Sequence, residues 1–325
     1  EDGNLYGDPD LNSDFTLSEY SSAIGAGTSV DAPATDINGN PRPNPSDSNP
    51  DMGAYENSLP SQLPKAGTIA DGLGVDVDWS NTTSSLSANW TPFTDDGAVT
   101  YEYAVGTSTN ALADVLDWTS NSSDTSVTKT GLSLTEGITY YISVRAIDID
   151  NQLSDTTTTD GLTIDATEPV INMIAEAADS DPLFQASDSS IVLFWDAVDD
   201  NSGIGYYEYS LGTSVGGTDI VEWNNAGTSD STTITDLVLM EGVTYWGSVR
   251  AVDAAGNVSM AQGNGVTVDI TAPEIGTVMD ITDLDNTIDQ GYTGSMTTLQ
   301  TSWSGFADNL SGIAAYEYAV GTGEL

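Results

Sequence analysis

The sequence predicts an all-β protein made largely of tandem β-sandwich domains. No long stretch has helical periodicity, several short segments alternate apolar and polar residues, and the chain repeats itself about every 105 residues. That period is too long for one rung of a solenoid and suits a complete β-sandwich. We therefore expect the 325 residues to form several modest cores rather than one.

The repeat is carried by aromatic motifs. The segment YEYAVGTS at residues 101–108 returns as YEYSLGTS at 207–214 and as YEYAVGTG at 316–323. Each copy follows a tryptophan: Trp90, Trp195 or Trp303. The first two copies continue with matching second halves and the third does not, so we expect a partial third domain. The predicted domains span residues 75–165, 166–270 and 271–325.

Alternation with a period of two locates strands inside each repeat. In SLSANW, residues 85–90, the side chains of Leu86, Ala88 and Trp90 share one face. In TYYISVRAI, residues 139–147, one face carries Tyr140 and every second residue after it. We expect these apolar faces to meet in the core of a sandwich.

These motifs resemble those of fibronectin type III domains. The shared features are the tryptophan of strand B, a tyrosine-bearing strand C and the segment LTEGITYYISVRA at residues 134–146. The resemblance covers residues 62–325 and implies a sandwich of two sheets. It also makes Tyr140 and Tyr245 tyrosine-corner residues, whose hydroxyl groups hydrogen-bond to nearby backbone.

The resemblance further implies two cross-strand ion pairs. Strands C and F are neighbours in this family, so Glu102 and Arg145 would stand on the same outward face. Glu208 and Arg250 would do the same in the next repeat. Such exposed pairs are worth about a few tenths of a kcal/mol each, so their expected role is structural.

Residues 1–57 do not fit the repeat. Their motifs follow in a fixed order: GDPDL at 7–11, SEYSSAIGAGT at 18–28, DINGNPRP at 36–43 and DMGAYE at 51–56. This series resembles the C-terminal end of right-handed parallel β-helix proteins of the pectate-lyase-like family, with departures at Ser22 and Gly25. The resemblance implies the last coils of a β-helix. Residues 58–74 are rich in proline and glycine and are predicted to be a linker.

The charge and the missing residue types exclude several functions. The chain has 50 acidic and 5 basic residues, a formal net charge of −45, no histidine and no cysteine. Nucleic acids and anionic membranes need basic partners, so neither is an expected ligand. A Ser-His-Asp triad, a thiol nucleophile and the usual zinc ligands are also excluded. We therefore expect no catalytic residues and no required cofactor in this chain.

Calcium is the one metal that the sequence suggests. Loops at one end of each predicted sandwich carry carboxylates and amides, which Ca²⁺ prefers as ligands. The candidates are Asp95, Asp96, Asp148 and Asp150 in the first sandwich, and Asp199, Asp200, Asn201, Asp253 and Asn257 in the second. The alternative is that Asp and Asn are present because turns use them to hydrogen-bond the backbone.

The repeated tryptophans Trp118 and Trp223 also have two interpretations. They could cover the edge of a sheet, or they could stack on a sugar ring. We favour packing, because a residue present in every complete repeat usually serves the fold.

These observations predict a secreted or cell-surface structural or adhesive protein, whose sandwiches act as spacers or assembly modules. Its expected partners are other copies, other surface proteins or polysaccharide, with no membrane insertion. The alternative is an accessory region of an extracellular polysaccharide lyase or hydrolase, serving as a spacer or binding carbohydrate.

Overall fold

The structure, a computed structural model, describes residues 8–176, 181–281 and 288–322. These residues form strands and loops and contain no helix, so none of them offers a helix that could cross a membrane. The chain divides into two compact units, Glu1–Thr167 and Glu168–Leu325. The all-β prediction is confirmed.

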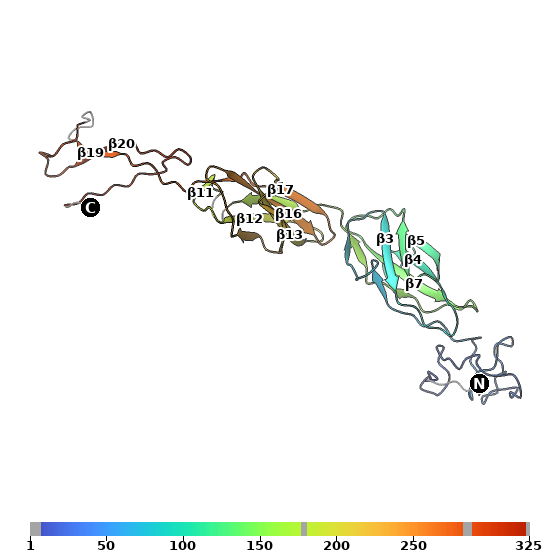
Figure 1. The fold of residues 1–325 in the computed structure, drawn as a ribbon. Helices are drawn as coiled ribbons and strands as arrows, with labels where there is room; N and C mark the ends of the chain where they lie inside the picture. Colours follow the sequence, from blue (N-terminus) through green and yellow to red (C-terminus); the bar gives the residue numbers. More distant parts are fainter. Residues whose placement is uncertain (1–7, 177–180, 282–287, 323–325) are drawn as a thin grey trace. The chain divides into compact units, whose positions relative to one another are not determined.

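The first unit contains a complete sandwich (Figure 1). One sheet has the order β1-β3-β6, formed by Ile69–Asp71, Ser85–Trp90 and Ser126–Thr130. The other has the order β2-β9-β7-β4-β5, and β8 also pairs with β7. Its strands are β2 (Trp79–Ser80), β9 (Leu162–Ile164), β7 (Thr139–Ile147), β4 (Thr100–Gly106), β5 (Leu116–Ser122) and β8 (Thr157–Thr158).

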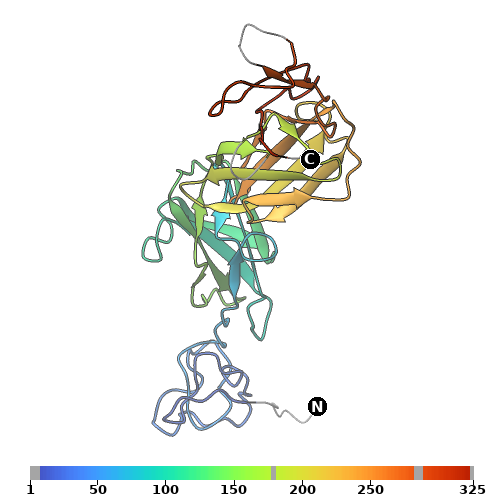
Figure 2. The same cartoon turned by 90° about the vertical axis from the view of Figure 1, so that its left-hand side faces the viewer.

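The second unit repeats this arrangement, and its strands form two layers (Figure 2). One sheet is β10-β12-β15, formed by Val170–Ala175, Ile191–Val198 and Ser231–Ile234. The other is β11-β18-β16-β13-β14, with β17 beside β16. Its strands are β11 (Phe184–Gln185), β18 (Val266–Val268), β16 (Thr244–Asp253), β13 (Ile204–Gly212), β14 (Val221–Gly227) and β17 (Val258–Gln262).

Both sandwiches have the strand order of a fibronectin type III domain. Strands A, B and E are β1, β3 and β6 in the first sandwich and β10, β12 and β15 in the second. They face strands C′, C and F, which are β5, β4 and β7 in the first and β14, β13 and β16 in the second, with strand G (β8 and β9, or β17 and β18) beside F. In the first core the rings of Trp90 and Tyr101 meet edge to face with centroids 5.6 Å apart, and in the second Trp195 and Tyr207 lie 5.7 Å apart. β3 alternates half-buried and buried residues, as its sequence pattern predicts. The fibronectin type III-like fold is therefore confirmed.

The tyrosine corner is present in both sandwiches. The Tyr140 hydroxyl accepts a hydrogen bond from the backbone N–H of Thr135 at 2.9 Å, and the Tyr245 hydroxyl accepts one from Met240 at 2.8 Å. Both tyrosines are buried. Each hydroxyl thereby fixes the loop that leads into strand F.

The expected linker at residues 58–74 needs correction, because β1 lies inside it. Residues Ile69–Asp71 pair antiparallel with β3, placing Ile69 opposite Trp90. Ala66 and Ile69 also pack against the first core. The prolines and glycines nearby obscured this strand, since only three residues form its ladder.

Residues 8–57 form loops without a strand, joined by the isolated bridges Leu11–Leu17 and Thr35–Pro41. Leu17, Ala23 and Ile24 are buried together, with Met52 and Leu59 against them. The coils of a β-helix are not seen in these residues, so that assignment stays a prediction.

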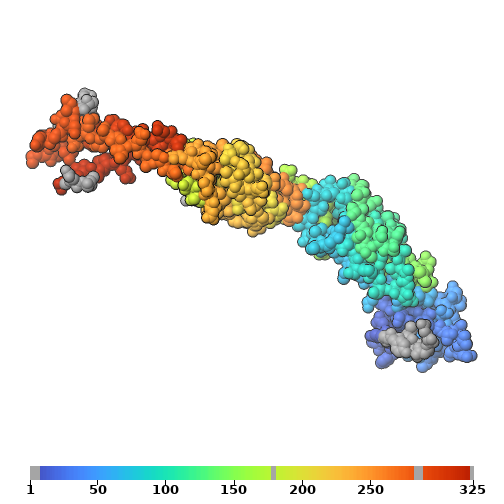
Figure 3. Space-filling model, viewed as in Figure 1, coloured from blue at the N-terminus to red at the C-terminus, as the bar shows by residue number. Residues whose placement is uncertain are grey.

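The third repeat is only partly ordered into strands. β19 (Thr277–Ile281) pairs with β20 (Gln300–Ser304), which carries Trp303. The third copy of the YEY motif, which begins at Tyr316, does not form a strand, because no described segment pairs with it as β16 pairs with β13. An open groove of about 980 Å³ remains among residues 273–321, lined by Trp303, Tyr316 and Tyr318 (Figure 3).

Candidate functional site

The structure gathers the predicted calcium residues of the first sandwich. Burial and the neighbouring carboxylates of Asp96 and Asp148 raise the pKa of Asp95. Burial and the carboxylates of Asp148 and Asp150 likewise raise the pKa of Asp96. The four acids therefore share one region, but among the described residues no three of them have carboxylate oxygens within 4.8 Å of one another.

In the second sandwich the B–C and F–G loops also meet. Carboxylate oxygens of Asp199 and Asp253 lie within 4.8 Å of each other, with Asp199 half-buried and Asp253 buried. Asp200 and Asn201 are exposed beside them, and Asn257 is half-buried.

These aspartates also hold turns. Asp148 accepts hydrogen bonds from the backbone N–H and the side-chain amide of Gln152 at 2.7 and 2.8 Å. Asp253 accepts the same pair from Asn257 at 2.8 and 2.7 Å. Asp199 accepts the N–H of Gly203 at 2.7 Å. Turn formation alone therefore gives these carboxylates a role, and calcium binding by them stays a prediction.

Each repeated tryptophan stacks on an arginine. The Arg145 guanidinium lies 4.1 Å from the centre of the Trp118 ring, and that of Arg250 lies 3.9 Å from the Trp223 ring. Arg145 also pairs with Glu102 at 2.7 Å, and Arg250 pairs with Glu208 at 3.5 Å. The predicted cross-strand pairs are confirmed. One face of each indole ring is thus covered by protein.

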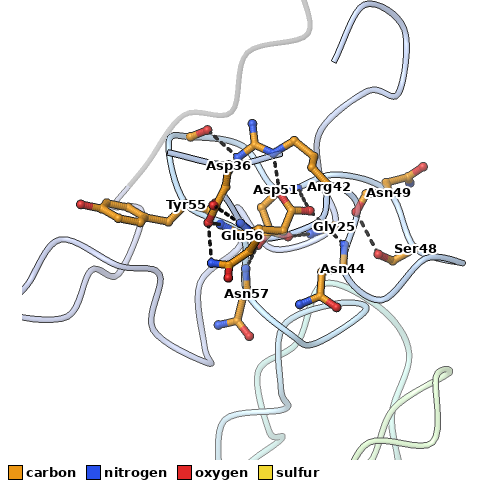
Figure 4. Close-up of polar contacts among 12 residues, drawn as sticks. Gly25, Asp36, Arg42, Asn44, Ser48, Asn49, Asp51, Tyr55, Glu56 and Asn57 are labelled. Atoms are coloured by element: carbon orange, nitrogen blue, oxygen red, sulfur yellow. Dashed lines mark hydrogen bonds and ion pairs between the residues drawn. The ribbon is translucent and has the colours of Figure 1, made fainter. Parts of the chain in front are cut away.

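The N-terminal motifs meet in a buried polar network (Figure 4). Arg42 Nε lies 2.6 Å from Glu56 Oε2, and Arg42 Nη2 donates to the carbonyl groups of Gly53 and Tyr55. Glu56 Oε1 accepts the backbone N–H groups of Asn44 and Asp51, both at 3.2 Å. The motifs DINGNPRP and DMGAYE are therefore joined through their charged residues.

Two aspartates complete this network. Asp51 accepts the N–H groups of Gly25 and Asn57, while burial raises its pKa. Asp36 accepts hydrogen bonds from Asn38, Asn40 and the backbone of Glu56. Burial of Asp36 opposes ionisation, but these hydrogen bonds outweigh it and lower its pKa.

Gly25 is required where it stands. Its φ is +62°, and a Cβ there would overlap the carbonyl oxygen of Pro60. The departure from the family motif at this position therefore leaves room for the chain leading toward the first sandwich.

Sequence reasoning missed a second group of acids. Asp71, Asp76 and Asp160 bring carboxylate oxygens within 4.8 Å of one another, and Asp71 is buried. Glu176 is the equivalent of Asp71 in the second sandwich and is also buried. The available signal was an acid at matching places in both repeats, with Asp71 inside the segment assigned to a linker and Glu176 in the second predicted domain.

No family model matches the chain. Chitinase A1 of Niallia circulans is 30% identical over 226 residues, covering 67% of this chain and 29% of that protein. Exoglucanase B of Cellulomonas fimi is 29% identical over 224 residues, covering 65% and 18%, and Exoglucanase A of the same organism is 32% identical over 143 residues, covering 41% and 14%. The chain thus spans less than a third of the length of these relatives.

Two solved structures are similar over comparable lengths. The FN1–FN3 domains of chicken CNTN1 match with a TM-score of 0.38 and 16% identity, covering 65% of this chain and 74% of that one. The central fibronectin-III array of RIM-binding protein matches with a TM-score of 0.21 and 17% identity, covering 68% and 75%.

Proposed function

We propose that this chain is a non-catalytic accessory region of an extracellular polysaccharide-degrading enzyme, in which its sandwiches separate other domains. The observation that carries the proposal is the similarity of up to 67% of the chain to a chitinase and two exoglucanases. The matched stretches are less than a third of those enzymes, which suits a region outside the catalytic centre.

The chemistry of the sandwiches supports a spacer role. The core aromatic residues Trp90, Tyr101, Trp195 and Tyr207 are buried, and Trp118 and Trp223 are half-buried with an arginine over one ring face. A platform for sugar stacking needs open, flat aromatic rings. Independent cores joined in series instead give a region that holds its neighbours apart.

A second candidate is a structural or adhesive surface protein whose repeats join copies. The open groove at residues 273–321 favours it, since Tyr316 and Tyr318 are exposed there. A groove that exposes aromatic rings in this way can be covered by a second chain.

The reading frame that encodes this chain gives the first test. It should also encode a polysaccharide-cleaving catalytic domain. A frame without such a domain would contradict the accessory role and leave the structural protein as the better proposal.

Co-sedimentation with insoluble chitin and cellulose tests the spacer role. The purified chain should stay in the supernatant with both polymers, as Trp118→Ala and Trp223→Ala variants should. Sedimentation of the wild type that either variant abolishes would show a carbohydrate-binding role in place of a spacer. Sedimentation velocity on the chain alone tests self-association.

A further inference from the structure

The end of strand A in the first sandwich holds a buried acid among other acids. Asp71 closes β1 and is 1% exposed. Its backbone N–H donates to Asp76 Oδ1 at 2.7 Å, and its Oδ2 accepts the N–H of Gly161 at 3.2 Å. Carboxylate oxygens of Asp71, Asp76 and Asp160 all lie within 4.8 Å of one another. This group links the first strand of one sheet to the turn before β9 in the other.

The second sandwich repeats the arrangement. Glu176 follows β10 and is 3% exposed. Its backbone N–H donates to Asp181 Oδ1 at 3.4 Å, and its Oε1 accepts the N–H of Gly265 at 3.3 Å. Asn264 stands where the first sandwich has Asp160, and its amide lies 2.6 Å from Asp181 Oδ2. The same backbone contacts therefore position an acid pair in both domains.

Glu176 shows a direct sign of an incomplete site. Its Oε2 atom is buried and has no hydrogen-bond partner among the described residues. The carboxyl group faces that of Asp181, close enough for a hydrogen bond when one of them is protonated. A buried carboxylate oxygen without a partner destabilises the folded state. Binding of a proton or a cation to Glu176 Oε2 would remove this destabilisation.

The two domains place this acid by different side chains. Asp71 packs beside Thr159, whereas the longer Glu176 lies against Gly263, where a Cβ would overlap Glu176 Oε1. The extra methylene of glutamate is thus matched by the missing side chain of glycine. A carboxylate reaches the same location in both sandwiches despite the change of residue.

No positive charge neutralises these acids within the described residues. The ion pairs of Arg42, Arg145 and Arg250 all involve other glutamates. The buried carboxyl groups of Asp71 and Glu176 therefore have no positively charged partner among the described residues, and a bound cation would supply one.

We propose that each sandwich binds one divalent cation of the Ca²⁺ type at this location. In the first sandwich Asp71, Asp76 and Asp160 supply carboxylate oxygens, and in the second Glu176 and Asp181 do so. Water completes the six to eight oxygens that Ca²⁺ takes. The ion ties strand A to the last strand of the opposite sheet, and these residues differ from the loop acids predicted from the sequence.

Calcium binding to the full chain tests the proposal. Equilibrium dialysis with CaCl₂ at pH 7.5 should show that Asp71→Asn and Glu176→Gln each bind one ion fewer than the wild type. Asp160→Asn, on an exposed turn that cannot disturb the core, should weaken binding at the first site. The control is Asp124→Asn, which removes the same charge from an exposed position and should bind as the wild type does.

Thermal melting provides the second readout. CaCl₂ should raise the melting temperature of the wild type by about 5 °C or more, whereas NaCl at the same ionic strength should not. The gain should shrink in Asp71→Asn and Glu176→Gln. If wild type and both variants bind equal numbers of ions, or if NaCl stabilises as well as CaCl₂, the proposal is wrong and the acids hold protons instead.

Discussion

The guanidinium of Arg42 and the carboxylate of Glu56 form an ion pair of 2.6 Å in which the Glu56 side chain is fully buried. The pair joins two motifs of the N-terminal segment, a region without a strand ladder. Its small apolar cluster contains three buried residues, Leu17, Ala23 and Ile24. The hydrogen bonds and ion pair of this polar network therefore stabilise much of the conformation of residues 8–57.

Replacing Arg42 by alanine should open this segment. The change leaves the Glu56 carboxylate buried without its charge partner, a loss typically of about 3–5 kcal/mol. Limited proteolysis should then cut within residues 8–57 while both sandwiches stay intact. The matched control is Arg145→Ala, because the half-exposed pair with Glu102 should contribute about 1 kcal/mol or less.

Replacing Tyr245 by phenylalanine should destabilise the second sandwich. The backbone N–H of Met240 loses the hydroxyl that accepts its hydrogen bond at 2.8 Å, which costs about 1–2 kcal/mol. Tyr140→Phe should have a similar effect on the first sandwich through Thr135. Urea unfolding measures both, with the more exposed Tyr206→Phe as control. Equal midpoints for Tyr245→Phe and Tyr206→Phe would contradict a stabilising corner.

Replacing Trp195 by alanine should unfold the second sandwich selectively. The side chain is 2% exposed and packs against Tyr207 and Tyr209, so its removal should cost about 3–5 kcal/mol. Calorimetry should show a lower transition temperature for this domain and an unchanged one for the domain built around Trp90. Trp223→Ala, which removes a half-buried ring, should have a smaller effect. A shift of both transitions would argue against separate cores.

The stability of the first sandwich should depend on pH through Asp71. Burial raises the pKa of Asp71 from 3.8 to about 7, with the carboxylates of Asp76 and Asp160 adding to the shift. The folded state thus keeps a proton that the unfolded chain releases above 3.8. The free energy of unfolding from this group therefore falls as pH rises from about 4 through 7.

Urea unfolding with a chelator at pH 4.5 and 7.5 measures this dependence. Asp71→Asn should lose less stability over that interval than the wild type, because it has no carboxyl group to ionise. Asp124→Asn controls for the general repulsion among 50 acidic residues and should behave as the wild type. Identical slopes in all three proteins would show that Asp71 titrates normally.

The local patterns of the chain determined its fold class. Alternation in SLSANW predicted the buried face of β3, because strand periodicity alone assigns side chains to faces. The resemblance of LTEGITYYISVRA and of its counterpart in the second repeat to fibronectin type III domains implied both tyrosine corners and the pairs Glu102–Arg145 and Glu208–Arg250. The short strand β1 was not predicted, because its three residues are too few to show a periodic pattern.

Only the tertiary structure decided what the acids do. Asp148 and Asp253 are aspartates like Asp71. They stabilise turns, however, by accepting hydrogen bonds from the residue four positions later in the chain. Asp71 meets Asp160 because opposite sheets bring together residues far apart in the chain. With 50 acidic residues in the sequence, composition cannot distinguish a turn carboxylate from a buried one. Burial and long-range neighbours determine that difference, and both arise only when the sheets pack.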